Sequence, residues 1–130
     1  MRPVMRRFPR PEDFFQPPFN DGEERHIKVM TFPIYWQEAG VYFCVIWDVD
    51  FEAPRMMILN HSLFPELREC IRRDLDDVVG QTFTVNCIHG GRIIRHLIVP
   101  TGMAPLLNQE KLKEIAAYAK GLYGPTEDEE

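Results

Sequence analysis

Three carboxylates at alternate positions are the first residues of this chain that could do chemistry: Asp48, Asp50 and Glu52. Alternate residues of a strand share a face, so these side chains would lie side by side. Such a group can hold Mg²⁺ or Ca²⁺, or serve as acid and base. No glycine-rich phosphate loop or lysine accompanies it. We therefore interpret the segment as a strand running out into solvent, and keep a divalent-metal-dependent enzyme as an alternative.

Zinc is the second chemistry to consider, with four candidate ligands: Cys70, Cys87, His89 and His96. Structural zinc sites usually combine two closely spaced pairs of ligands, and only Cys87-x-His89 is close here. The cysteines fit better as small buried residues on strands and a helix. We therefore predict no metal and no cofactor. Three cysteines spaced 26 and 17 residues apart form no disulfide framework, which indicates a reducing compartment.

Nucleophilic catalysis has no candidate set. The only serine, Ser62, stands where it would cap a helix, and no nucleophile lies on a glycine-flanked turn. We therefore predict that the protein is not an enzyme.

Charge is segregated along the 130 residues, which carry 15 basic and 20 acidic side chains and a net charge of −5. The first ten residues contain four arginines and no acid, whereas the last four are all acidic. An acidic body argues against broad phosphate-backbone binding, so nucleic acid is not an expected partner. RNA binding through the arginines of the leader is kept as an alternative. No apolar run reaches the ~18 residues of a membrane span, so we expect no membrane partner.

Proline and phenylalanine are concentrated in residues 1–25, which we call the leader. Proline withholds amide donors and disfavours helix in the residue before it, so we predict an irregular segment. It is either disordered or an arm that docks on a partner or on the domain itself. The residues that we predict to bind protein lie in the leader and in two basic stretches of the body: Arg6, Arg7, Phe8, Phe14, Phe15, Phe19, Arg68, Arg72, Arg92 and Arg95.

The elements that must position these residues follow from periodicity. Strands are predicted at 26–36 (interrupted by Pro33), 41–51, 55–59, 82–87 and 92–99, with a turn at His89-Gly90-Gly91. Helices are predicted from Ser62 to Gly80 and over 108–123, the second capped by Asn108. The order β-β-β-α-β-β-α indicates an α+β fold, a mostly antiparallel sheet of about five strands with two helices packed on it. This single domain spans 26–123, and 124–130 form an acidic tail.

Two apolar faces support this assignment. Val41, Phe43, Val45, Trp47, Val49 and Phe51 alternate onto one face of the second strand, while its other face becomes polar toward its end. Leu112, Ile115, Ala119 and Leu122 would face inward from the last helix, with Gly121, Gly124 and Pro125 ending it.

The third strand and first helix carry a family resemblance. Met57 and Leu59, followed by Leu67-Arg68-x-Cys70, and later Ile88-His89-Gly90, resemble motifs of the adenoviral early-region-4 34K family. The resemblance covers about residues 40–100, the N-terminal part of those longer proteins.

The resemblance implies a viral early protein, an adaptor without catalysis that binds host or viral regulatory proteins in the host nucleus. Those proteins recruit a cullin–elongin ubiquitin ligase through a Leu-x-x-x-Cys box, whereas here Leu67 and Cys70 are separated by only two residues. We therefore expect a shortened relative that binds one partner. Two alternatives remain open: a self-associating module that forms a homo-oligomer, or a chaperone-like acidic α/β module. The alternative location is the cytoplasm.

Overall fold

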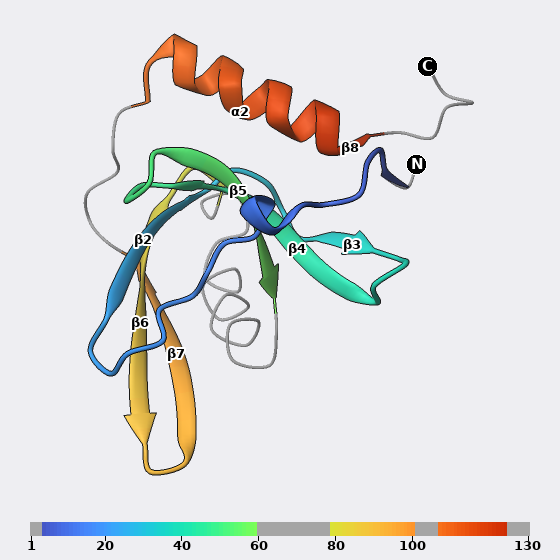
Figure 1. The fold of residues 1–130 in the computed structure, drawn as a ribbon. Coiled ribbons are helices and arrows are strands. Elements are labelled where there is room, and N and C mark those ends of the chain that lie inside the picture. The colour runs from blue at the N-terminus through green and yellow to red at the C-terminus, as the bar shows by residue number, and fades with distance from the viewer. Residues whose placement is uncertain (1–3, 60–78, 101–106, 125–130) are drawn as a thin grey trace.

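The computed structural model describes residues 4–59, 79–100 and 107–124 (Figure 1). Within them the chain is a mixed α+β protein with a mostly antiparallel sheet. The elements in chain order are β1 (Val4–Met5), the 3₁₀ turn η1 (Pro11–Asp13), β2 (Glu24–Val29), β3 (Ile34–Trp36), β4 (Val41–Asp48), β5 (Ala53–Leu59), β6 (Thr82–Gly90), β7 (Ile93–Pro100), α2 (Gln109–Leu122) and β8 (Tyr123–Gly124). The helix predicted from Ser62 to Gly80 falls almost wholly on 60–78, outside the described residues.

The main sheet has six strands rather than about five, because the strand predicted over 26–36 is split into β2 and β3. Both pieces pair with one edge of β4, whose other edge pairs with β5. The sheet continues from β2 to β6 and β7, antiparallel at every step. Between the pieces, where Pro33 has no amide hydrogen to donate, the Val45 amide donates to the Thr31 hydroxyl at 2.9 Å. The predicted interruption is thereby confirmed.

Strand β4 is buried on both faces. Phe43, Val45 and Trp47 lie in the core beneath α2, as the predicted apolar face requires. Cys44 and Ile46, on the opposite face, lie in a second core with Ile27 and Phe83. The predicted length of this strand is wrong, because β4 ends at Asp48. Phe51 lies in the following turn and is exposed instead of extending the apolar face.

Helix α2 confirms the prediction for 108–123. The Asn108 side chain accepts a hydrogen bond from the Lys111 amide at 2.9 Å, which makes it the N-cap. Ile115 and Leu122 are buried as predicted, but Leu112 is exposed. Gly121 lies within the helix rather than ending it. In the part of the chain that the structure covers, no helix has the length and apolarity needed to cross a membrane.

Strands β6 and β7 form a long hairpin that projects from the sheet on the side away from α2 (Figure 1). Strand β2 accompanies β6 only as far as the Glu24–Asn86 pair, so the rest of the hairpin extends beyond it. Its strands run to Gly90 and Ile93, so the turn is Gly91-Arg92, and His89 and Gly90, predicted to lie in the turn, belong to β6 instead. Gly91 has a φ of 67°, which glycine adopts without strain.

The described part of the leader is docked on the domain. Strand β1 pairs with β8, which brings the first and last described residues of the chain together beside α2 (Figure 1). Phe14 forms a single bridge with Met56 on the free edge of β5. Around that edge, Phe14 packs into the core under α2 and Phe15 into the opposite core. The leader therefore packs against both faces of the sheet.

Candidate protein-interaction sites

The three carboxylates of the 48–52 segment do not converge. Asp48 is buried and accepts a hydrogen bond from the Arg55 guanidinium at 3.0 Å. Asp50 accepts one from the His26 amide at 2.8 Å. Glu52 pairs with the Lys111 ammonium at 2.8 Å, and this cation lowers the pKa of Glu52. Among the residues that the structure describes, no group of three His, Cys, Asp or Glu side chains could hold a metal.

The zinc candidates serve the packing of the leader. Cys87 is fully buried and lies opposite His96 in the β6–β7 ladder. The Nε2 atom of His96 is 2.8 Å from the Pro18 carbonyl oxygen, and that of His89 is 2.6 Å from the Phe19 carbonyl oxygen. Both rings are thus hydrogen-bonded to the leader. Cys70 lies outside the described residues.

Arg7 is bound within the molecule rather than presented to a partner. Its guanidinium makes two 2.8 Å hydrogen bonds to the carboxylate of Asp13. The same carboxylate, which is buried, accepts from the Tyr118 hydroxyl at 2.9 Å and the Arg10 amide at 2.6 Å. These donors hold the pKa of Asp13 well below its usual range, with Arg7 the largest cause. The hydrogen bonds among Arg7, Asp13 and Tyr118 therefore connect the leader to α2.

Neither Asp13 nor Tyr118 is among the residues that the sequence predicts to be functional. They are 105 residues apart, and neither has a neighbour in sequence that marks it. Glu12 and Asp13 lie together between Pro11 and Phe14, and nothing in the sequence indicates that one of the two is buried. Burial without a positive partner would be unfavourable, so only the fold that brings Arg7 and Tyr118 to it makes this position stable.

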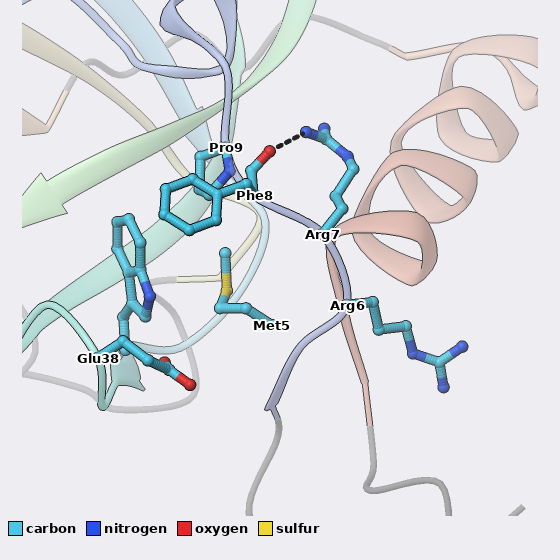
Figure 2. A pocket seen from close by; sticks show the side chains of 7 residues that line it. Met5, Arg6, Arg7, Phe8, Pro9 and Glu38 are labelled. Carbon is cyan, nitrogen blue, oxygen red and sulfur yellow. Dashed lines mark hydrogen bonds between the residues drawn. The ribbon is translucent and has the colours of Figure 1, made fainter.

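Arg6 and Phe8 border an open pocket, which we call the leader notch (Figure 2). It has a volume of about 290 Å³, and its lining comes from the leader and from the β3–β4 turn: Met5, Arg6, Arg7, Phe8, Pro9, Trp36 and Glu38. Phe8 is 88% exposed. Figure 2 shows Met5, Phe8 and Glu38 on one side of the leader, while Arg6 points to the other side and the Arg7 guanidinium turns back to the Phe8 carbonyl oxygen. The apolar part of the notch is therefore bordered by a carboxylate.

The other predicted phenylalanines divide into two kinds. Phe14 stacks on Trp36, with ring centroids 6.5 Å apart, and Phe15 is buried in the core, so both are structural. Phe19 is exposed and lies edge-on to His89 at the hairpin, with ring centroids 6.2 Å apart. Only Phe8 and Phe19 remain available for a partner.

The outer part of the β6–β7 hairpin is the second candidate surface, which we call the hairpin edge. It contains the exposed Ile88, Ile93 and Ile94 together with the exposed Arg92 and Arg95. Across residues 82–100 there is no Asp or Glu, although the chain as a whole carries a net charge of −5. Arg92 and Arg95, which we predicted to bind protein, therefore lie on the same hairpin as three exposed isoleucines. Arg68 and Arg72 lie outside the described residues, so their expected proximity to the hairpin stays a prediction.

Comparison with protein-family models, with curated proteins and with solved structures finds no match for this chain.

Proposed function

We propose that this protein is a non-enzymatic interaction module that binds an extended, acidic segment of a partner protein along the hairpin edge. The observation that carries the proposal is an outer strand, β7, that is apolar, basic and unpaired on its outer side by any described residue. The resemblance to the adenoviral 34K family supports a host or viral regulatory protein as the partner and the host nucleus as the location.

An unpaired edge offers backbone donors and acceptors to any extended chain. Natural proteins usually protect such edges with charge, proline or a covering element. Here β7 runs for eight residues, and Arg95 is its only permanently charged side chain. Strand addition uses such an edge: main-chain hydrogen bonds supply affinity, and side-chain contacts supply specificity.

Charge indicates whether a second copy of this chain or an acidic partner segment is the better occupant of this edge. A second copy of β7, paired with the first around a twofold axis, would bring two arginine-bearing, acid-free strands together, which is unfavourable. An acidic segment would instead place carboxylates beside Arg92 and Arg95, which favours both orientation and association rate. We therefore place self-association behind binding of an acidic partner.

Reversing these two charges tests the proposal directly. The variant Arg92→Glu/Arg95→Glu changes only exposed side chains, so its fold is retained. The matched control, Lys113→Glu/Lys120→Glu on the exposed side of α2, changes the net charge by the same amount. Each protein is used as bait in nuclease-treated nuclear extract, and bound proteins are identified by mass spectrometry.

A partner retained by the parent chain and the control, but lost at least about tenfold in the hairpin variant, supports the proposal. With that partner purified, hydrogen exchange must show the amides of β7 becoming protected in the complex. A partner insensitive to Arg92 and Arg95, or protection elsewhere in the chain, overturns it. An obligate dimer in light scattering that the hairpin variant dissociates would favour the self-associating alternative.

A further inference from the structure

The leader notch holds a combination of groups that the rest of the molecule uses to bind cations. Its walls are the half-buried Trp36 ring and the exposed Phe8, and the carboxylate of Glu38 lies at its border (Figure 2). Phe14 stacks against Trp36 from the leader side. For Glu38, unlike Glu52, the structure records no ion pair or hydrogen bond among the described residues.

Elsewhere the same combination is already occupied. The Lys111 ammonium lies 5.7 Å from the centre of the Trp47 ring and 2.8 Å from a carboxylate oxygen of Glu52. An aromatic face and a carboxylate therefore hold a lysine between them, each contributing electrostatic attraction. Trp36 and Glu38 repeat this pair of groups two residues apart, without a cation recorded for them in the described chain.

The arginines that border the notch do not supply that cation. Arg7 is committed to Asp13 and lies over the Tyr118 ring, 5.9 Å from its centre. The Arg6 guanidinium lies against Gly124. In Figure 2 neither guanidinium points toward Glu38. The Asp13 carboxylate also neutralises Arg7, which lowers its repulsion of an incoming positive charge.

Size limits the occupant to a single side chain. A volume of about 290 Å³ is at the lower end of the range for small-molecule pockets. Apolar walls suit the methylene stem of arginine or lysine, whose charged end can reach the border of the notch. We infer that the leader notch binds one arginine or lysine side chain of a partner protein, with Trp36 and Phe8 against its stem and head and Glu38 paired with its charge.

The indole N–H signals in an NMR spectrum provide the test. The chain has two tryptophans, and Trp47 is only 3% exposed, so its signal is an internal control. The full-length protein is titrated with a capped Ala-Ala-Arg-Ala-Ala peptide and with versions carrying lysine, citrulline or glutamate at the centre. Citrulline has nearly the shape of arginine without the charge.

We expect saturable shifts of the Trp36 signal with the arginine and lysine peptides, and not with citrulline or glutamate. Glu38→Gln and Phe8→Ala should each weaken the affinity about three- to tenfold. Phe19→Ala, a change at the other exposed phenylalanine of the leader, should leave it unchanged. Equal binding of the citrulline peptide would overturn the inference, as would tighter binding of the glutamate peptide or insensitivity to Glu38→Gln. The charge-reversed hairpin variant should bind the arginine peptide normally, so the two proposals can fail separately.

Discussion

The hairpins β4–β5 and β6–β7 each contain one long apolar strand, and these two strands, β4 and β7, have opposite environments. Both hairpins are antiparallel, and both β4 and β7 contain several valine or isoleucine residues. Strand β4 is buried from Phe43 to Asp48, under α2 on one face and facing the Ile27–Phe83 core on the other. Strand β7 buries only Ile98 and exposes five of its eight residues.

The difference comes from position in the sheet. Strand β4 has neighbours along both edges, and the leader contributes Phe14 and Phe15 to the two cores that contain it. Strand β7 is at the end of the sheet, beyond the reach of α2 (Figure 1). Apolar sequence alone therefore does not define the core, and an apolar strand left outside it is a natural place for binding.

The largest expected effect is on stability, where a substitution in β4 should cost far more than one in β7. Phe43→Ala removes a fully buried ring beneath α2 and should lower the free energy of unfolding by about 3–5 kcal/mol. Ile93→Ala, at a residue 63% exposed, should change it by no more than about 0.5 kcal/mol. Urea denaturation measures both. A similar loss for Ile93→Ala would mean that the hairpin edge is covered in the folded protein, and would contradict the contrast between β4 and β7.

The next effect tests how the leader is fastened to the β4–β5 side. Asp13→Ala leaves Arg7 and the Tyr118 hydroxyl without their acceptor and should cost about 2–3 kcal/mol, since Arg7 itself is partly exposed. The neighbouring Glu12→Ala changes an exposed side chain and should stay within about 0.5 kcal/mol. Thermal unfolding compares the two variants. Equal melting temperatures would show that the leader is held by its phenylalanines alone.

Acid should weaken the same attachment. The pKa of Asp13 is depressed in the folded state, chiefly by Arg7, so the unfolded chain takes up the proton more readily. The stabilisation is therefore complete well above the unfolded-state pKa of about 3.9 and is lost as the pH falls below it. Asp13→Asn, less stable at neutral pH, should show a flatter decline between about pH 5 and pH 3. Urea midpoints across this range measure it, and parallel curves would contradict the assignment.

The smallest effect compares a thiol from each hairpin. Burial raises the pKa of Cys44 to about 12, and burial, with Asp21 and Glu23 nearby, raises that of Cys87. Both thiols should resist a disulfide reagent in the native protein. Cys87 should react at least about tenfold faster, because the projecting hairpin opens more easily than the centre of the sheet. Peptide mapping after timed labelling resolves the two sites, and equal rates would indicate that both hairpins open as one unit.

Much of this architecture can be predicted from local pattern. Alternation located β4 and both strands of the β6–β7 hairpin, and the Asn108 cap located the start of α2. Pro33 predicted the break between β2 and β3, because proline cannot donate to a strand ladder. The ends of two elements were predicted wrongly: β4 does not reach Phe51, and Gly121 does not end α2. Neighbouring elements rather than propensity determine the last residue there.

The sites were less predictable, because residue type does not reveal the contacts that a side chain makes. Arg7, Phe14 and Phe15 were chosen for the same reasons as Phe8 and Phe19, yet the first three hold the leader in place. Nothing in the sequence marks Trp36 and Glu38 as a site, since the notch forms only when the leader lies beside the β3–β4 turn.

The strand periodicity, the class of fold, the charge segregation and the arginines of the hairpin can be predicted without coordinates, because these features depend on residues close together in the chain. Which apolar residues are core, which are surface, and which carboxylates are already paired become known only from the folded arrangement. Burial and electrostatic pairing depend on partners such as Arg7, Asp13 and Tyr118, which lie far apart in sequence and meet only after the leader, the sheet and α2 have packed together.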